Sequence, residues 1–333
     1  METSAPTSAP IFVDAASVAR HLPWPELLQA LHSAFAATDL STPTRGHYSM
    51  EGMGSTSTPV LLSMPAWSPR LGVGVKLVAV YPDNHTLNLP SIHGLYVLMA
   101  GASGRPQAVL DAGELTARRT AAASALASRF LSRPDSATLL MVGTGRLSQY
   151  LPLAHAQVRP IERVLVWGRS QAKAQESADA LQAQGVNAMP VRALEDACAQ
   201  ADIISCATLS KTSLLRGDWL RPGTHVDLVG AFTPQMREAD DQVFQRAASV
   251  WCDTSAGALA EAGDLIQALA SGALARDRIR GDLADLCQAG TPAPRHDADI
   301  TVFKSVGAAL EDLAAARLCL ERLKSATAAP QAR

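Results

Sequence analysis

The chain of 333 residues has no apolar run as long as the roughly 18 residues that a membrane-spanning helix requires. It also has no block of lysine and arginine, and its formal net charge is −2. Proteins that bind nucleic acid or anionic membranes carry such blocks, so neither partner is expected. Residues 1–10 lack the basic and apolar regions of a signal peptide, and we expect a flexible tail there and a cytoplasmic location.

Cysteine is scarce and irregularly placed. The number of cysteines is odd, no two of them have Cys-x-x-Cys spacing, and they stand at positions 198, 206, 252, 287 and 319. Disulfide frameworks and zinc sites are built from paired, regularly spaced cysteines. The sequence therefore predicts neither disulfides nor a bound metal, and a reducing compartment suits the chain.

The chain has two regions with different patterns of predicted secondary structure, and its length favours two domains. Residues 24–39 show helical spacing, short β-type runs fill 58–111, and an Ala-rich helix is predicted over 113–131. From about residue 136, buried strands alternate with helices, which is typical of a doubly wound α/β fold with a parallel sheet. The last strand is predicted at 300–307, and the helix after it is expected to return to the first domain.

The turn Gly143–Ser148, with the letters GTGRLS, directly follows a predicted strand and opens a helix predicted to run to about residue 157. The first glycine permits a tight turn, and the second lets the backbone approach a pyrophosphate at the helix start. The third position requires only a small residue, which Ser148 is. We predict a dinucleotide site here, with an ordinary glycine turn as the alternative; its residues are Gly143, Thr144, Gly145, Arg146 and Leu147.

The end of the next predicted strand indicates which dinucleotide binds. Sites for NAD usually carry an acidic residue there, which holds the ribose 2′-hydroxyl. Here the strand ends in Trp167, Gly168, Arg169 and Ser170, with Lys173 one turn later. Because a guanidinium grips a phosphate with two hydrogen bonds, Arg169 favours NADPH, although NADH is possible. The alternative is that Arg169 stacks on the adenine or faces solvent.

Seven segments of the chain together point to a known family. They are PTR at 43–45, GVKLVAVYPDN at 74–84, LTARRTAAASALA at 115–127, MVGTGRLS at 141–148, VWGRS at 166–170, GDL at 263–265 and FKSVG at 303–307. In this order and spacing the chain resembles the ornithine cyclodeaminase/mu-crystallin family. The resemblance implies a homodimer, a Rossmann domain at 129–305, and an α+β substrate-binding and dimerisation domain made of 1–128 and 306–333.

The resemblance also implies that three cations bind the substrate's α-carboxylate, and the matching positions are Arg45, Lys76 and Arg119. Lys76 lies in an apolar strand, which is a costly place for an ammonium without an anion. Either it faces a ligand anion or it snorkels to solvent. Arg119 stands beside Arg118, and the family register selects Arg119. We name Lys76, Arg119 and His47 as candidate catalytic residues, since His47 follows Arg45 by two positions.

One position departs from the cyclodeaminases, which carry an aspartate where this chain has Phe232. An aromatic ring can neither accept a proton nor pair with an ammonium, so expulsion of ammonia loses its acid/base group. The chain is more similar to the ketimine reductases of the family, which reduce Δ1-pyrroline-2-carboxylate to L-proline and Δ1-piperideine-2-carboxylate to L-pipecolate. The alternatives are an ornithine cyclodeaminase, an alanine dehydrogenase, or a non-catalytic NADPH-binding and ligand-binding protein of the mu-crystallin kind.

Further candidates follow the predicted strands. Thr208, Leu209, Val229, Gly230 and Ser305 are expected beside the nicotinamide half of the cofactor, and Phe232 beside the substrate. The resemblance adds Ser91, with His93, to the cofactor contacts, and either His47 or His93 could be a proton donor or a structural histidine. Remaining polar residues have structural interpretations: Asp111 as a helix cap, Asp264 as a loop tie, Glu238 and Asp240 as an acidic helix start, and Lys304 as a possible surface residue.

Overall fold

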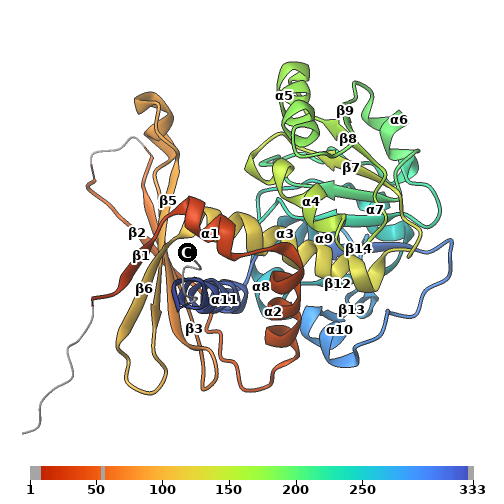
Figure 1. The fold of residues 1–333 in the computed structure, drawn as a ribbon. Coiled ribbons are helices and arrows are strands. Elements are labelled where there is room, and N and C mark those ends of the chain that lie inside the picture. Colours follow the sequence, from red (N-terminus) through yellow and green to blue (C-terminus); the bar gives the residue numbers. More distant parts are fainter. Residues whose placement is uncertain (1–8, 54–56, 329–333) are drawn as a thin grey trace, which may run out of the picture. The chain divides into compact units, whose positions relative to one another are not determined.

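The computed structural model describes residues 9–53 and 57–328, and the chain divides into two compact units (Figure 1). Within the described ranges, unit 1 takes its residues from 1–30, 37–119 and 308–333, and unit 2 consists of 31–36 and 120–307. The division at 119/120 falls inside one helix, α3 (Ala112–Leu131). The domain boundary predicted at 128/129 lies further along the same helix.

Unit 1 contains a mixed six-stranded sheet, and the β-type runs predicted over 58–111 supply four of its strands. Its strand order is β1-β6-β5-β4-β3-β2; only β1 and β6 are parallel, and all other neighbours are antiparallel. The strands are β1 (Ile11–Val13), β2 (Gly46–Ser49), β3 (Val60–Ser68), β4 (Gly72–Val80), β5 (Ile92–Met99) and β6 (Pro106–Asp111). The helices are α1 (Ala15–His21), the start of α2 (Trp24–Ala36), η1 (Pro82–Leu87), the start of α3 and the closing helix α11 (Ala309–Ala328).

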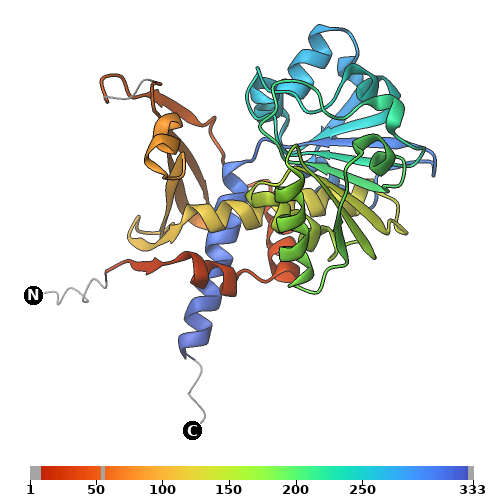
Figure 2. The same ribbon diagram turned by 90° about the horizontal axis from the view of Figure 1, so that it is seen from above.

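The closing helix α11 covers one face of this sheet. It packs against β3, β4 and β5 and also contacts α1, as the blue and red helices of Figure 2 show. Alternate residues of β4, namely Gly72, Gly74 and Lys76, are buried on this face, as the two-residue period of a strand requires. The C-terminal helix therefore returns to the first unit, as the sequence predicted.

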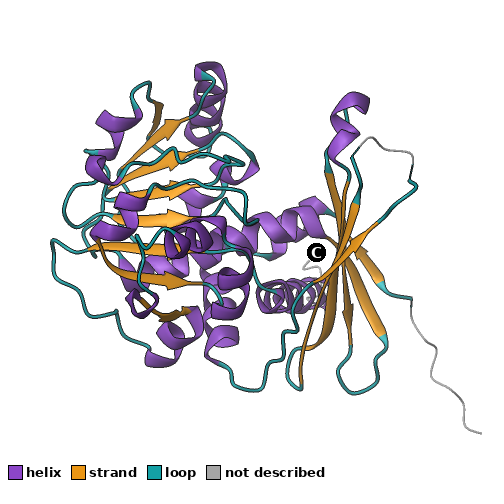
Figure 3. Ribbon diagram, turned by 180° about the vertical axis from the view of Figure 1, so that it is seen from behind, coloured by secondary structure: helices purple, strands orange, loops and turns teal. Residues whose placement is uncertain are grey.

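Unit 2 contains eight parallel strands in the order β13-β12-β14-β11-β10-β7-β8-β9. The strands β9-β8-β7-β10-β11 have the order 3-2-1-4-5 of a Rossmann sheet, with the switch point between β7 and β10. The sixth position is taken by β14, and β12 and β13, which precede it in the chain, lie beyond it. Helices lie on both sides of the sheet (Figure 3). The strands are β7 (Thr138–Val142), β8 (Arg163–Trp167), β9 (Ala188–Pro190), β10 (Ile203–Cys206), β11 (His225–Leu228), β12 (Ala247–Cys252), β13 (Ile279–Asp282) and β14 (Ile300–Lys304).

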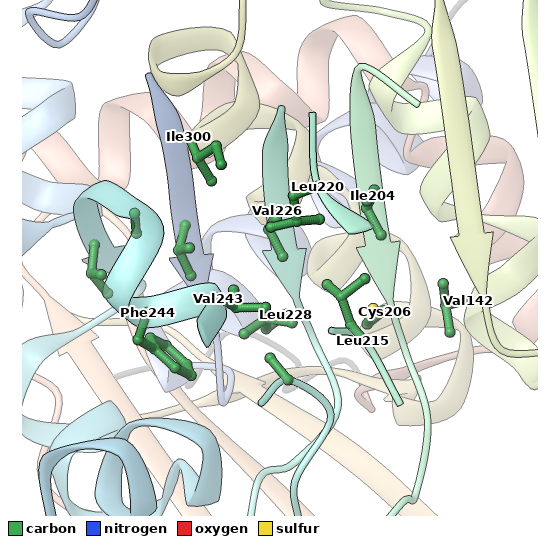
Figure 4. Packing of buried hydrophobic residues seen from close by; sticks show 14 of the residues in the cluster. Val142, Ile204, Cys206, Leu215, Leu220, Val226, Leu228, Val243, Phe244 and Ile300 are labelled. Carbon is green, nitrogen blue, oxygen red and sulfur yellow. The ribbon is translucent and has the colours of Figure 1, made fainter. Parts of the chain in front are cut away.

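The core of unit 2 is built from apolar runs that are buried on both faces of the sheet. Figure 4 shows Val142, Cys206 and Leu228 on adjacent strands, with Phe244 of a helix at one side of the cluster; all four are at most 1% exposed. The helices are α4 (Leu151–His155), α5 (Gln171–Gln182), α6 (Leu194–Cys198), α7 (Asp241–Arg246), α8 (Ser255–Glu261), α9 (Gly263–Ala270), α10 (Leu283–Ala289) and the ends of α2 and α3.

The sequence predicts one helix from the glycine turn to about residue 157, and this prediction is wrong. The structure has a 3-10 turn, η2 (Arg146–Gln149), followed by the short helix α4. Pro152 stands in the first turn of α4 and lacks the N–H that a continuous helix needs, so the chain restarts there.

Candidate active site

Lys76 lies in the middle of β4 on the face that α11 covers. Its side chain is 2% exposed, and Nζ lies 2.7 Å from Oδ2 of Asp312. The alternative that Lys76 snorkels to solvent is therefore wrong. Burial, helped by the charges of Arg119 and Arg45, lowers the pKa of Lys76 to about 8, although Asp312 opposes this.

Arg119 joins Lys76 from helix α3. Its Nε lies 2.9 Å from Oδ1 of Asp312, and its Nη1 lies 2.7 Å from Oε2 of Glu311. Burial disfavours the guanidinium charge, but these two carboxylates hold the pKa of Arg119 above its usual value. Its neighbour Arg118 instead pairs with Glu114 on its own helix.

Arg45 completes the set of three cations. It immediately precedes Gly46, which pairs with Ser63, so Arg45 stands at the level of Met64, the cross-strand neighbour of Lys76. Its charge contributes to the lowered pKa of Lys76. We call Arg45, Lys76, Arg119, Glu311 and Asp312 the ion cluster.

His47 is the predicted catalytic residue that the structure does not place in the ion cluster. It lies on the edge strand β2 with an exposed side chain, in register with Leu62. In the same unit, Ser91 is half-buried just before β5, and its carbonyl accepts a hydrogen bond from Tyr81. His93 is exposed on β5, where Asn84 approaches its ring to 3.5 Å.

The two carboxylates of the ion cluster were missed by the sequence analysis. Glu311 and Asp312 open helix α11, and both side chains are at most 1% exposed. Two adjacent acids in a helix otherwise rich in alanine and leucine were the available signal. Buried acids need cations, and the only buried cations expected in unit 1 were those of the substrate site.

In unit 2, the glycine turn follows β7 at the carboxyl edge of the sheet, next to the switch point. Gly143 has φ +120°, and a Cβ there would lie 2.6 Å from the carbonyl oxygen of Ala207, which follows β10. No atom would meet a Cβ at Gly145 within 4 Å. The turn is therefore tightly packed where glycine permits close approach and open where a pyrophosphate would lie. These residues fit a dinucleotide.

Ser148, at the third fingerprint position, is buried. Its hydroxyl donates to the Gly145 carbonyl at 2.8 Å and lies 3.2 Å from the Ser177 hydroxyl of α5. Thr144 packs against Gly168, where a Cβ would lie 2.5 Å from the threonine methyl group. The turn is thus joined to the next βα unit through small side chains.

At the end of β8, the side chains expected to hold the adenosine ribose are accessible. Arg169 and Lys173 are exposed, and Ser170 caps α5 by accepting a hydrogen bond from the Lys173 backbone N–H. Trp167 donates its indole N–H to the carbonyl of Arg192. A cation, a hydroxyl and a helix start therefore adjoin one another here. The remaining predicted contact on the turn, Arg146, is exposed, and Leu147 is half-buried.

The segments that follow β10 and β11 are held by a buried carboxylate. Both the backbone N–H and the hydroxyl of Thr208 donate to Oε1 of Glu238, at 2.6 and 2.7 Å. That same oxygen would lie 2.4 Å from a Cβ at Gly230. Val229 is buried, whereas Leu209 is 76% exposed. Thr208 and Gly230 are thus adjacent, as two neighbouring parallel strands predict.

The sequence suggested that Glu238 belongs to an acidic helix start, but α7 begins only at Asp241 and Glu238 is 0% exposed. The interpretation of Lys304 as a surface residue is also wrong, since it too is 0% exposed. Its Nζ donates to the carbonyls of Leu228 and Gly230 and lies 3.9 Å from Oδ2 of Asp264. We call Glu238, Asp264 and Lys304 the buried triad.

Asp264 ties a loop, as predicted: its Oδ1 accepts the backbone N–H groups of Glu238 and Ala239. Two other interpretations are also confirmed. Asp240 caps α7 by accepting the Val243 N–H, and Asp111 accepts the Glu114 N–H at the start of α3. Burial raises the pKa values of both carboxyl groups in the triad, and the Lys304 charge opposes this.

A third missed residue, Asp253, follows β12. Its Oδ2 accepts the backbone N–H groups of Val306 and Gly307 at 2.8 and 2.6 Å, directly after Ser305. The side chain of Ser305 is 3% exposed. Asp253 therefore fixes the segment that the family resemblance places beside the nicotinamide.

Phe232 stands at the end of a strained turn. The preceding residue, Ala231, has φ +51°, which is rare for any residue other than glycine, and its carbonyl accepts the Gly263 N–H. Phe232 itself is 39% exposed. Strained backbone is frequent at ligand sites, and this turn presents an aromatic ring at the carboxyl edge of the sheet.

The model of the ornithine cyclodeaminase/mu-crystallin family matches residues 9–327. An uncharacterized protein of Schizosaccharomyces pombe is 42% identical over 317 residues, which cover 92% of this chain and 96% of that protein. The Delta(1)-pyrroline-2-carboxylate reductase of Paracoccus denitrificans is 36% identical over 308 residues, covering 92% and 95%.

A solved structure is also similar over almost the whole chain. The Delta(1)-pyrroline-2-carboxylate reductase of Thermococcus litoralis, in complex with NADH and L-proline, has a TM-score of 0.88 and 27% identity. The likeness covers 95% of this chain and 98% of that one.

Proposed function

The chain belongs to the ornithine cyclodeaminase/mu-crystallin family, and on that premise we propose that it reduces cyclic ketimine carboxylates with NADPH. The substrates in this proposal are Δ1-pyrroline-2-carboxylate, which gives L-proline, and Δ1-piperideine-2-carboxylate, which gives L-pipecolate. Relatives named as reductases make the chain an oxidoreductase of C=N bonds with a nicotinamide cofactor.

The observation that carries the proposal is the charge of the ion cluster. Its three cations and two carboxylates leave one formal positive charge (three minus two), which suits a ligand with a single carboxylate. Because Glu311 and Asp312 are already in place, Lys76 and Arg119 are held in position before any substrate arrives. A preorganised cation site binds its anion without first having to order long side chains.

Lys76 is suited to a second task. With a pKa of about 8, its ammonium is protonated at neutral pH yet gives up a proton more readily than an ordinary lysine. Reduction of a neutral imine requires one proton at nitrogen, and we assign Lys76 as its source. The bound nicotinamide supplies the hydride to the imine carbon.

Phe232 argues for reduction without deamination. The cyclodeaminases carry an aspartate at this position, and no carboxylate side chain replaces it here. Reduction of a preformed cyclic imine does not need that group, and an aromatic ring provides an apolar wall for an unsubstituted ring.

The preference for NADPH rests on Arg169. Its guanidinium and Lys173 are exposed beyond the carboxyl end of β8, beside the cap of α5. A 2′-phosphate there could accept charge-assisted hydrogen bonds, whereas an NADH ribose offers only hydroxyls. The variant Arg169→Ala should therefore weaken NADPH binding about 10-fold or more and leave NADH binding nearly unchanged. Equal losses for both cofactors would refute this preference.

A homodimer is proposed from the sheet face of unit 1 opposite α11. Apolar side chains lie in register on this face: Pro65, Val75, Val97 and Val109 form one row, and Leu77 and Leu95 stand together in another. Leu77 and Leu95 are 39% and 45% exposed. A self-complementary apolar face suits a second copy of the same chain. The variant Leu77→Lys should then sediment as a monomer while wild type sediments as a dimer; unchanged sedimentation would refute this interface.

The central test is an initial-rate assay with Δ1-pyrroline-2-carboxylate, following NADPH oxidation and identifying L-proline as product. The variant Arg119→Met should lower kcat/KM about 10–150-fold, because it removes charge-assisted hydrogen bonds. Arg118→Met is the matched control, since Arg118 pairs with Glu114, which is not a carboxylate of the ion cluster, and it should retain activity. No oxidation of either NADPH or NADH by the wild-type protein would refute the function.

A further inference from the structure

One carboxylate of the ion cluster, that of Asp312, contacts two of its cations at once. Oδ2 lies 2.7 Å from Nζ of Lys76, and Oδ1 lies 2.9 Å from Nε of Arg119. Resting on the proposed function, we propose that Asp312 is a positioning residue for the reduction, which fixes the direction of the Lys76 ammonium and keeps its proton available for the imine.

The geometry separates Asp312 from its neighbour Glu311. Glu311 accepts a hydrogen bond from Nη1 of Arg119 at 2.7 Å, and its other oxygen accepts the Ala308 N–H at the start of α11. Asp312 and Glu311 are both buried, adjacent and bound to Arg119, and Asp312 adds a direct contact with Lys76.

Lys76 is surrounded by groups from several elements. Arg119 of α3 and Arg45, before β2, bring positive charge, and Asp312 of α11 brings the opposing negative charge. Nζ of Lys76 donates a hydrogen bond to the Thr116 hydroxyl of α3 at 3.4 Å, and the cross-strand neighbour of Lys76 on β5 is Tyr96. The hydroxyl of Tyr96 stays protonated, because burial and then the Asp312 charge raise the pKa of Tyr96 well above its usual value.

Asp312 is therefore the anion that balances a buried ammonium beside two other cations. Without its charge, burial and the two arginines would disfavour the protonated form of Lys76. The ammonium would also lose the acceptor that fixes its direction, since the Thr116 contact is long. Substrate could still bind through Arg45 and Arg119, so the loss is expected in the reduction step more than in binding.

The experiment compares Asp312→Asn with Glu311→Gln by the pH dependence of kcat/KM, which reports the titrating groups of the free enzyme. In the wild type, kcat/KM should fall above about pH 8, as Lys76 loses its proton. Removing a charge in direct contact lowers a lysine pKa by about 1–3 units, so Asp312→Asn should move this decline to lower pH and reduce kcat/KM at pH 7 about 2- to 90-fold. Glu311→Gln should raise KM without changing the pH at which the decline begins. Asp312→Glu should return the decline to the wild-type pH.

A second measurement does not depend on turnover. The chain has five lysines, so labelling them with ¹⁵N gives few side-chain signals, and Lys76→Arg identifies the one from Lys76; they are Lys76, Lys173, Lys211, Lys304 and Lys324. The titration of this signal should move to lower pH in Asp312→Asn only. Equal movement in Glu311→Gln, or none in Asp312→Asn, would overturn the role of Asp312. If the signal moves as expected but no imine is reduced, the proposed function fails instead.

Discussion

Removing the charge of Lys304 is expected to destabilise unit 2 strongly, and the effect should depend on pH. Lys304 is the cation of the buried triad, where it lies 3.9 Å from Asp264 and donates to the carbonyls of Leu228 and Gly230. In Lys304→Met the side chain keeps a similar volume but leaves the carboxyl groups of Glu238 and Asp264 without their cation. Because the shape of the side chain changes little, the loss of charge should account for most of the change in stability.

The expected size follows from the burial of all three groups, each 0% exposed. Removing one partner of a buried ion pair costs about 3–5 kcal/mol, because the remaining charge is uncompensated. For a folding unit of about 150–250 residues, each kcal/mol shifts the melting temperature by about 2–4 °C. Lys304→Met should therefore melt about 6–20 °C lower than wild type at pH 8.

The sign of the pH dependence follows from the carboxyl pKa values. Burial raises the pKa values of Glu238 and Asp264 in the folded protein, and loss of Lys304 raises them further. Groups with a raised folded pKa stabilise the fold at low pH, and this stabilisation is lost as pH rises through the folded pKa. The deficit of the variant should thus be small near pH 5 and large near pH 8.

Thermal melts of Lys304→Met and wild type at both pH values test the reasoning, with Lys173→Met, an exposed lysine of α5, as the control. The control should melt like wild type. If Lys304→Met loses less than about 1 kcal/mol of unfolding free energy, or the same amount at both pH values, the charge of Lys304 does not stabilise the fold as expected.

Three further substitutions test the architecture of unit 2. Gly143→Ala places a Cβ 2.6 Å from the Ala207 carbonyl oxygen at φ +120°, so NADPH binding measured by fluorescence titration should weaken at least about 10-fold; unchanged binding would contradict the tight turn. Asp253→Asn weakens the acceptor of two backbone N–H groups after β14 and should lower the urea-unfolding free energy by about 1–3 kcal/mol. Ser148→Gly removes the contact with Ser177 and should destabilise the protein by about 1 kcal/mol while keeping cofactor affinity; a stabilised variant would be unexpected.

The parallel sheet of unit 2 could be predicted because its signals are local. Apolar runs such as that ending at Val142 are bounded by glycines, and the period of strand and helix repeats along the chain. The two strands that escaped prediction, β9 and β13, are short and contain Pro190 or Gly281. Such residues weaken the strand signal, and neighbouring strands supply the pairing that propensity does not.

The positions of Gly143 in the glycine turn and of Arg119 in the ion cluster agree with what their motifs predict, whereas sequence motifs do not predict which residues are buried. Glu238 looks like a surface acid beside Asp240, because nothing local shows that one is enclosed and the other caps a helix. Lys304 likewise stands at the end of a strand whose burial depends on both neighbours. Both residues are buried by contacts with neighbouring strands or the segments that follow them: Glu238 accepts from Thr208, and Lys304 donates to the carbonyl of Leu228.

The ion cluster and the buried triad have one physical property in common. In each, a lysine on a buried strand meets a carboxylate brought by a distant segment: Lys76 meets Asp312, and Lys304 lies near Asp264. Buried ion pairs add little net stability compared with apolar packing. Their presence is better explained by what they hold in place, namely the cations proposed to bind the substrate carboxylate in unit 1 and the segment around Gly230 in unit 2.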